Sequence, residues 1–364
     1  RGSPAEDARV ALVPSVVPQL VKSGLDVIVE RGAGESAGFP DADYAQHGAH
    51  LGTRRDALEA DIVVRVRGWG LDGHGNLDVS HPDQVVIALA DPLGSPIAVR
   101  AAAEHKLVTL ALDLVPRITR AQGMDALSSQ ATATGYKAVV LAADRLPKMF
   151  PMLTTAAGTI SPAQVFVVGA GVAGLQAIAT ARRLGAVVQA YDVRPAAQED
   201  IESLGARCIL LPLAPGDAED ESGYAKELGT AFYRRQQELM EQVVAGVDVV
   251  ITTALIPGAP APTLITADAV AGMQPGSIIV DCAAERGGNC ELTRADETVV
   301  TDNRVTIFGP TNLPSTLPHD ASLMYSKNVV ALLGLIVKDG RLALDEQDEI
   351  VRGALVTRGG EIVN

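Results

Sequence analysis

Three glycines with the spacing Gly-x-Gly-x-x-Gly follow an apolar run that begins at Val165. In such a pattern Gly169 permits a tight turn between a strand and a helix, Gly171 lets a phosphate group approach the backbone, and Gly174 lets the helix lie close to the strand. The amide groups of a helix starting at Val172 are then free to bind phosphate. A glycine-rich structural turn is the alternative in a chain with 35 glycines, but the position between an apolar strand and a helix indicates a dinucleotide-binding fingerprint.

A carboxylate follows the next expected strand. Asp192 comes 18 residues after Gly174, at the end of the apolar run 187–191. A carboxylate at this place accepts hydrogen bonds from the adenosine ribose hydroxyls and repels the extra phosphate of NADP. The sequence therefore predicts a preference for NAD(H), slightly weakened by the neighbouring Arg194.

A polar segment precedes a long expected helix. From Pro116 it reads Pro-Arg-Ile-Thr-Arg-Ala-Gln-Gly-Met-Asp-Ala-Leu-Ser-Ser-Gln. Gln122 offers both a donor and an acceptor, which suits a carboxamide ligand, and Ser128 is expected to cap the helix. On chemistry alone, an ordinary surface helix start explains the segment as well.

Bulk properties restrict the class of protein. A chain of 364 residues is expected to form two domains. A net charge of −14 argues against nucleic acid and anionic lipid as partners. The longest apolar run, Val329–Val337, is far shorter than the roughly 20 residues of a membrane span, so no direct membrane insertion is expected. No signal peptide is recognisable, although residues could precede Arg1.

No metal site or disulfide framework is expected. The three cysteines have no Cys-x-x-Cys spacing and read as reduced thiols of a cytoplasmic protein. His47 and His50 lie near two aspartates, but scattered histidines on a helix surface are commoner than metal ligands.

The elements that position these residues form two βα series. In the first, a helix is expected over 15–23, capped by Ser15 and followed by Gly24, and a loop over 68–81. The expected strands are Arg9–Val13, Asp26–Glu30, Ile62–Val66, Val85–Ala90 and Leu107–Leu112. Strands that alternate with helices indicate right-handed βαβ units and a parallel sheet.

The second series begins at Gln164, after a helix expected over 128–143. Its six strands, the number in a complete dinucleotide-binding fold, are expected at Val165–Val168, Val187–Tyr191, Cys208–Leu211, Val247–Thr252, Ser277–Asp281 and Val305–Phe308. The apolar helix pattern of Met324–Val337 should pack back against the first domain. We therefore expect an α/β protein of two Rossmann-like, doubly wound parallel-sheet domains separated by a cleft. Their boundaries are expected at residues 1–126, completed by 309–364, and 127–308.

Together these segments resemble the NAD(H)-binding component, domain I, of proton-translocating transhydrogenases, within the alanine dehydrogenase/transhydrogenase family. The resemblance covers nearly the whole chain. Besides the fingerprint and the segment at Pro116, the similar stretches are Arg9-Val-Ala-Leu, Asp192-Val-Arg194, Gly223-Tyr224-Ala-Lys-Glu, Thr252-Thr-Ala-Leu-Ile-Pro-Gly-Ala-Pro-Ala-Pro, Gly287-Gly-Asn-Cys290 and Val356-Thr-Arg-Gly-Gly-Glu-Ile-Val. One departure is the Gly-rich segment 68–78, which carries the only tryptophan, Trp69, in place of a short proline-containing loop.

The resemblance implies roles for particular residues. The nicotinamide and its ribose would be held by the catalytic group Arg117, Gln122, Asp125 and Ser128. The pyrophosphate would be held by Gly169, Gly171 and Gly174, with Val172 against the cofactor. The adenosine would meet Asp192, Val193 and Arg194, and Leu255 would lie beside the nucleotide. Gly223 and Tyr224 would belong to a mobile loop that closes over NAD(H), which suits the Pro-, Gly- and acid-rich stretch 213–223.

The resemblance also implies a reaction and partners. Hydride would pass directly between two nicotinamide rings, so the site needs position and dryness and no acid or base. This chain would bind NAD(H), while NADP(H)-binding and membrane-spanning components would complete the enzyme and move protons. A homodimer is implied, peripheral on the cytoplasmic face of the inner membrane through those components.

Two other functions fit parts of the sequence. An alanine dehydrogenase needs a proton acceptor and a carboxylate clamp. Its pattern has a histidine after the strand that here ends before Asp91, where none is present, and a lysine where this chain has Arg65, although Arg9 is retained. A non-catalytic NAD-binding sensor is compatible with the fingerprint, but it would not need the residues at Arg117–Ser128.

Overall fold

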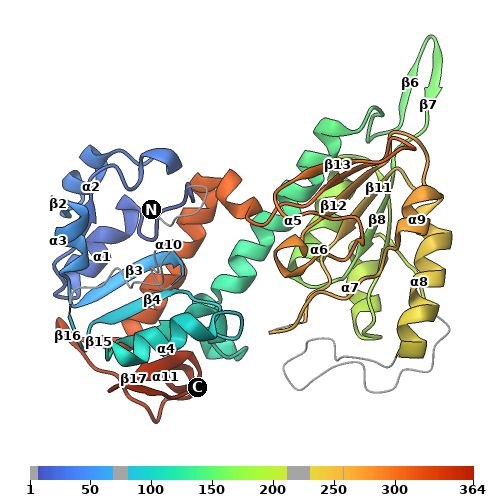
Figure 1. The fold of residues 1–364 in the computed structure, drawn as a ribbon. Helices are drawn as coiled ribbons and strands as arrows, with labels where there is room; N and C mark the ends of the chain where they lie inside the picture. Colours follow the sequence, from blue (N-terminus) through green and yellow to red (C-terminus); the bar gives the residue numbers. More distant parts are fainter. Residues whose placement is uncertain (1–6, 69–80, 211–229, 257) are drawn as a thin grey trace. The chain divides into compact units, whose positions relative to one another are not determined.

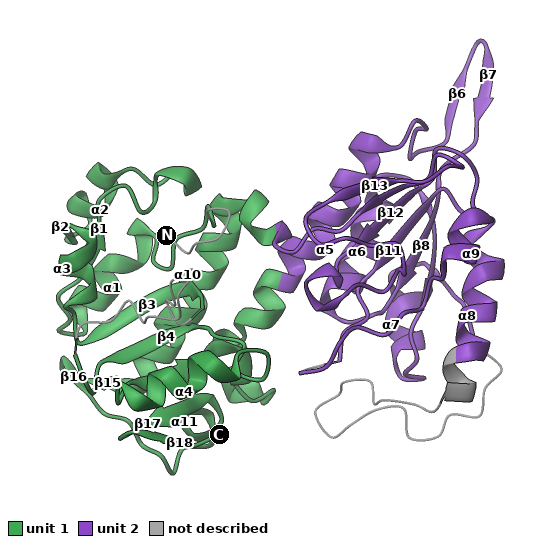
Figure 2. Ribbon diagram, viewed as in Figure 1, with its two compact units in different colours: residues 1–130, 314–364 green, residues 131–313 purple. Residues whose placement is uncertain are grey.

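A computed structural model describes residues 7–68, 81–210, 230–256 and 258–364. The chain forms two compact units, one of residues 1–130 with 314–364 and one of residues 131–313 (Figure 2). Each unit is built on a mainly parallel sheet with helices packed on it, so the protein has the α/β fold expected from the sequence (Figure 1).

The second unit contains a seven-stranded sheet in the order β10-β9-β8-β11-β12-β14-β13. Neighbouring strands are parallel except for the last pair. Numbered along the chain, the six parallel strands therefore lie in the order 3-2-1-4-5-6 of a dinucleotide-binding fold. The strands are β8 (Gln164–Val168), β9 (Val187–Tyr191), β10 (Arg207–Cys208), β11 (Val249–Thr252), β12 (Ile278–Asp281), β13 (Thr298–Val300) and β14 (Thr306–Phe308).

All six strands expected in this unit are confirmed, and β13 is additional. Side chains of the central strands alternate between two apolar clusters, so the sheet is buried on both faces. The edge strand β13 exposes Thr298 and Val300 and carries no such apolar signal. The helices of this unit are α6 (Val172–Arg183), α7 (Ala197–Ser203), α8 (Thr230–Val244), α9 (Ala267–Ala271) and most of α5 (Ala126–Arg145). A short hairpin, β6 (Leu153–Thr155) and β7 (Gly158–Ile160), stands away from the sheet (Figure 1).

The first unit has its strands in separate sheets. Five form the order β18-β17-β5-β4-β3, and β1 pairs with β2 alone among the described residues. The strands are β1 (Ile28–Glu30), β2 (His50–Gly52), β3 (Ile62–Arg67), β4 (Val85–Leu89), β5 (Val108–Ala111), β17 (Leu355–Arg358) and β18 (Glu361–Ile362), with a small ribbon of β15 (Val337–Lys338) and β16 (Arg341–Leu342). The helices are α1 (Val17–Lys22), α2 (Asp41–Gln46), α3 (Arg54–Leu58), α4 (Pro96–Glu104), α10 (Pro318–Ile336) and α11 (Glu349–Ala354).

The strand expected over residues 9–13 is wrong. Backbone amides of this segment donate to serine hydroxyls near or on α10 and not to a neighbouring strand. The pairs are Ala8 to Ser315 (2.8 Å), Val10 to Ser322 (2.9 Å) and Val13 to Ser326 (3.1 Å). The expected cap is also wrong, because a 3₁₀ turn over Pro14–Val16 precedes α1 and no side chain caps that helix.

The carboxy-terminal helix packs into the first unit, as expected. Tyr325, Val329 and Leu333 of α10 belong to the same apolar cluster as Ile87 and Leu110 of the sheet. Among the residues that the structure describes, no helix combines the length and the apolar character needed to cross a membrane.

Asp348 links helix capping to pH in the first unit. Its carboxylate accepts from the amide of Ile350 at 2.9 Å and from Arg120 at 2.6 and 3.0 Å. The hydrogen bond with the Arg120 guanidinium lowers the pKa of Asp348 to about 2. Because the folded state lowers this pKa, the stabilisation is present above about pH 4 and is lost as the pH falls toward 2.

Asp348→Ala should lower the free energy of unfolding by about 1 kcal/mol at pH 7, through loss of the cap of α11. The difference from the unmodified chain should shrink as the pH falls from 4 toward 2, measured by urea unfolding at each pH. Glu104→Ala, at an exposed helix end, is the matched control and should change little. A difference that does not depend on pH would contradict this role of the carboxylate.

Candidate functional site

The Gly-x-Gly-x-x-Gly segment forms the turn between β8 and α6. Gly169 has a φ of +96°, and a Cβ there would lie 2.7 Å from Thr253 Oγ1. A Cβ on Gly174 would lie 1.8 Å from the carbonyl oxygen of Gly169, so only glycine lets the helix sit this close to the strand. A Cβ on Gly171 would meet no protein atom within 4 Å. Gly171 is the N-cap and has no side chain with which to cap α6, so the first amides of the helix are available to a ligand.

Two residues that the sequence analysis did not single out hold this turn. Thr253, after β11, donates two hydrogen bonds to it: its amide bonds the Val168 carbonyl at 2.8 Å and its hydroxyl the Gly169 carbonyl at 3.1 Å. Gly135 of α5 would place a Cβ 2.0 Å from the carbonyl oxygen of Ala173. The first turn of α6 is thus packed against a strand and a second helix, which no local pattern reveals.

Asp192 follows β9 and is tied to the glycine turn. Its carboxylate accepts from the amide of Ala170 at 2.6 Å. It also accepts from the amide of Arg194 at 2.8 Å, and from the guanidinium of Arg194 at 2.9 and 3.1 Å. These four donors match the roughly four lone-pair positions of a carboxylate. The predicted carboxylate therefore lies beside the predicted phosphate turn, and Arg194 occupies its outer side.

Asn289 shapes the loop that carries Leu255. It is fully buried, accepts from the amide of Ala254 at 3.0 Å, and donates to the carbonyls of Ala254 at 2.8 Å and Pro262 at 2.9 Å. Leu255 itself is exposed. The only sequence signal for Asn289 is its place in the Gly-Gly-Asn-Cys stretch, because its function as a clamp depends on residues 27 to 35 positions away.

A buried carboxylate supports the same loop from β12. Asp281 accepts from the hydroxyls of Thr252 (2.8 Å) and Thr293 (2.6 Å) and from the amides of Ala283 and Cys290 (both 3.0 Å). Burial raises the pKa of the Cys290 thiol to about 11. All three cysteines are free, and this thiol stays protonated and unreactive at neutral pH.

The segment at Arg117–Ser128 lies in the first unit. Arg117 and Gln122 are exposed. The expectation that Ser128 caps the helix is wrong, because α5 begins at Ala126 and Asp125 is the capping residue. The Asp125 carboxylate accepts from the amide of Ser128 at 2.8 Å and from its hydroxyl at 2.6 Å. Asp precedes the helix at the position where its side chain reaches the third amide, which is the usual geometry of a cap.

The remaining expected site residues divide into two sets. Val172, at the first position of α6, is exposed, and Val193 is half-buried between Asp192 and Arg194. Gly223, Tyr224 and Trp69 lie outside the residues that the structure describes. The second unit therefore brings together the glycine turn, Asp192, Arg194 and the loop of Leu255.

Comparison with known protein families covers both units. The profile of the alanine dehydrogenase/PNT N-terminal domain matches residues 3–134, and that of the alanine dehydrogenase/PNT C-terminal domain matches residues 138–364. The chain belongs to the alanine dehydrogenase/PNT family. The sequence resemblance inferred from the motifs is thereby confirmed.

Within this family, the chain is more similar to transhydrogenase subunits than to alanine dehydrogenases. It is 45% identical to an NAD(P) transhydrogenase subunit alpha chain of Rhodospirillum rubrum, over 99% of this chain and 95% of that protein. The corresponding subunit alpha chain of Rickettsia prowazekii is 42% identical, over 98% and 93%. Alanine dehydrogenase of Halomonas elongata is 29% identical, over 96% and 90%.

Solved structures agree with this placement. The crystal structure of transhydrogenase from Sinorhizobium meliloti has a TM-score of 0.88 and 44% identity, and covers all of this chain and 98% of that one. A structure of L-alanine dehydrogenase has a TM-score of 0.79 and 25% identity, and covers all of this chain and 95% of that one. The family's parallel-sheet, Rossmann-like fold is therefore shared by this chain.

The two glycines of the turn should respond differently to an added methyl group. Gly174→Ala should destabilise the protein by about 1–3 kcal/mol or more, because the methyl group would collide with the Gly169 carbonyl. Gly171→Ala, at a φ of −73° and facing open space, should stay within about 0.5 kcal/mol of the unmodified chain. Equilibrium unfolding in urea measures both. Equal stabilities of the two variants would show that α6 does not approach β8 this closely.

Proposed function

We propose that this chain is the NAD(H)-binding subunit of a proton-translocating transhydrogenase, in which hydride passes directly from NADH to NADP⁺ held by a partner. The observation that carries the proposal is the glycine turn of β8–α6 with Asp192 beside it. The open space at Gly171 and the uncapped first turn of α6 suit a pyrophosphate. Membership of the family and similarity to the transhydrogenase subunits support the reaction.

The choice of NAD(H) over NADP(H) rests on Asp192. A ribose diol can donate to this carboxylate in place of the Arg194 guanidinium, which lies on its outer side. A 2′-phosphate offers only acceptors, and would meet a carboxylate of like charge. We infer that Arg194 turns away from Asp192 when NADH binds and that Val193 and Leu255 then contact the nucleotide.

The nicotinamide end is assigned through the family. Arg117, Gln122, Asp125 and Ser128 would hold the carboxamide and ribose of the nicotinamide, and Gly223 and Tyr224 would belong to a loop closing over the cofactor. NAD(H), when bound, supplies the hydride. These residues include no histidine, cysteine or lysine, in keeping with a reaction that needs orientation and exclusion of water but no proton transfer on the substrate.

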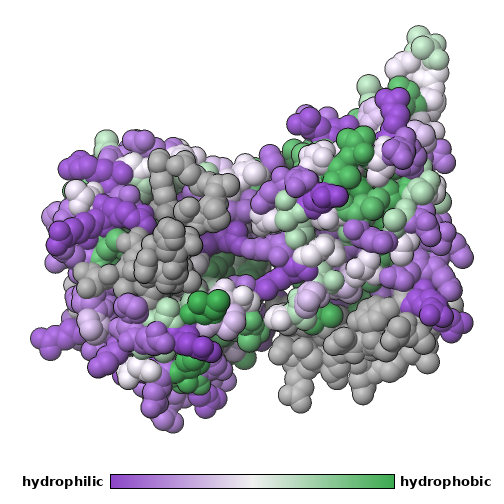
Figure 3. Space-filling model, viewed as in Figure 1, coloured by the Kyte–Doolittle hydropathy of each residue, from purple (hydrophilic) through white to green (hydrophobic). Residues whose placement is uncertain are grey.

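The proposed partners are an NADP(H)-binding component and a membrane-spanning component, which would hold this chain at the cytoplasmic face of the inner membrane. A homodimer is part of the proposal. The hairpin β6–β7 supports it, since Met152, Leu153 and Ile160 are exposed there. Figure 3 shows hydrophobic residues gathered on the surface near the foot of this hairpin. Exposed apolar clusters of this kind are typical of interfaces.

An amino-acid dehydrogenase is a weaker candidate. The Arg9 guanidinium, retained from the alanine dehydrogenase pattern, is buried and committed to Asp7 at 2.6 and 2.9 Å and to Gln130 at 2.7 Å. It is therefore occupied within the protein and poorly placed to clamp a substrate carboxylate.

Calorimetric titration with NADH and NADPH tests the cofactor assignment. We expect NADPH to bind at least about 30-fold more weakly, because like charges would be brought together at Asp192. Asp192→Asn should narrow that ratio, and Gly171→Ala should weaken both ligands by about tenfold or more while the protein stays folded. Asp200→Asn, on the exposed face of α7, is the matched control. Comparable affinities of the unmodified chain for the two cofactors would overturn the role of Asp192.

Mixing the chain with an NADP(H)-binding transhydrogenase component separates an enzyme subunit from a sensor. We expect hydride transfer from deuterium-labelled NADH to NADP⁺, with the label recovered in NADPH. Gln122→Ala should slow transfer more than it weakens NADH binding, because a carboxamide left unheld is poorly oriented. Tight binding of NADH without any transfer would favour the sensor.

A further inference from the structure

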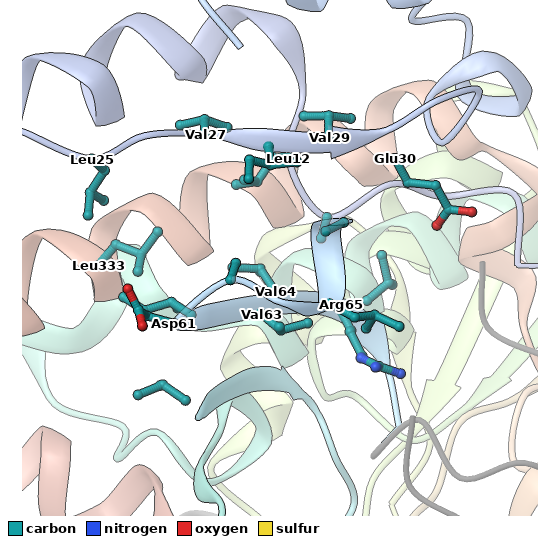
Figure 4. Close-up of a pocket in the computed structure, with 18 of the residues that line it drawn as sticks. Leu12, Leu25, Val27, Val29, Glu30, Asp61, Val63, Val64, Arg65 and Leu333 are labelled. Atoms are coloured by element: carbon teal, nitrogen blue, oxygen red, sulfur yellow. The ribbon is translucent and has the colours of Figure 1, made fainter. Parts of the chain in front are cut away.

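The sheet of the first unit is interrupted between β1 and β3. In the portion of the chain that the structure describes, β1 pairs with β2 and β3 pairs with β4, each along one edge. A cavity of about 1590 Å³ separates the two other edges. Figure 4 shows Val27 and Val29 of the β1 segment facing Val63 and Val64 of β3 across this space.

The second unit shows which strand this position normally holds. Its first strand, β8, lies in the centre of the sheet, between the second strand β9 and the fourth β11. In the first unit β1 and β2 correspond to strands two and three, and β3, β4 and β5 to strands four to six. The order becomes 3-2-1-4-5-6 in both units if one parallel strand stands between β1 and β3. The interruption is therefore at the position of strand one.

The walls of the cavity suit a strand that is buried on both faces. Leu20 of α1 and Leu333 of α10 line it, as do Leu58 of α3 and Ile97 of α4. Ile97 is 77% exposed, which is costly for a large apolar side chain unless something covers it. A strand covered by helices on both sides is nearly continuously apolar. The cavity also exceeds the roughly 300–1,000 Å³ of small-molecule sites.

The path of the chain indicates where such a strand is attached. Val10 and Val13 bond to serines of α10 on either side of Tyr325, whose hydroxyl donates to the Arg65 carbonyl of β3 at 2.5 Å. The chain therefore passes the cavity near the later residues of β3, and Asp7 and Arg9 line it. A strand parallel to β3 ends on that side, so it can continue directly into the segment that leads to α1.

We propose that an apolar β-strand of five or six residues, joined to the chain on the amino-terminal side of Asp7, inserts between β1 and β3 as a parallel central strand. Residues 1–6 read Arg-Gly-Ser-Pro-Ala-Glu and do not have the composition of such a strand, so it lies ahead of Arg1. Six linking residues span up to about 20 Å, which is enough to reach a strand ending beside Asp7. The matched relatives from Rhodospirillum rubrum and Rickettsia prowazekii have residues beyond the aligned segment, since 95% and 93% of them are covered.

Hydrogen exchange tests the proposal on two extended proteins. One carries a six-residue Val/Ile strand ahead of Arg1, and the matched control carries the same extension with proline at its second and fourth positions, which cannot donate to a ladder. With the apolar extension we expect amides of β1 and β3 to exchange at least about tenfold more slowly than in the present chain, because ladder bonds protect amides. Amides of β8 and β11 should not change and report that the second unit is folded.

A synthetic peptide of the same strand, added to the present chain, is the second measurement and should slow the same amides saturably. Equal protection by the proline-bearing extension, or no protection by either form, would overturn the proposal. Amides of β1 and β3 that are already as slow as those of β8 would do so as well. Protection in the present chain that rises with its own concentration would mean that a second copy fills the gap, which also contradicts an amino-terminal strand.

Discussion

The candidate site depends on one close approach between two stretches of backbone. The first turn of α6 lies against the carbonyl of Gly169 so tightly that a single Cβ at Gly174 would occupy the same space. This approach directs the uncapped amides of the helix to the place where the strand ends. Thr253 and Gly135 hold the turn from β11 and α5, so its geometry is a property of the whole second unit.

Buried polar groups then align the loops around that turn. Asp281 and Asn289 each satisfy several donors or acceptors from different segments, and an unpaired group at either position would cost about 1–3 kcal/mol. Their bonds fix where β11 ends and where the loop of Leu255 begins. Asp192 has the same character on the other side of the turn, since it joins Ala170 to Arg194. A rigid cradle with few titratable groups suits the positioning of a cofactor more than acid–base chemistry.

The first unit uses hydrogen bonds of another kind. Serine hydroxyls of α10 take the amides that a neighbouring strand would take, and the carboxy-terminal helix thereby becomes part of a unit that begins at the other end of the chain. The long-range pairing explains why the two segments of this unit, 1–130 and 314–364, fold together.

Local patterns in the amino-acid sequence were enough to predict the elements whose signal is itself local. Runs of branched apolar residues predicted all six parallel strands of the second unit, because a strand buried on both faces needs them at every position. The spacing of Gly169, Gly171 and Gly174 and the place of Asp192 predicted the turn, because each demand is set by the backbone of the residue itself. Long-range contacts determined the remaining features. Residues 9–13 have the composition of a strand but bind serines some 310 positions away, Asp125 rather than Ser128 caps α5, and Asn289 and Thr253 act on loops distant in sequence. A side chain that can bond equally well to several partners carries no record of which one folding brings within reach.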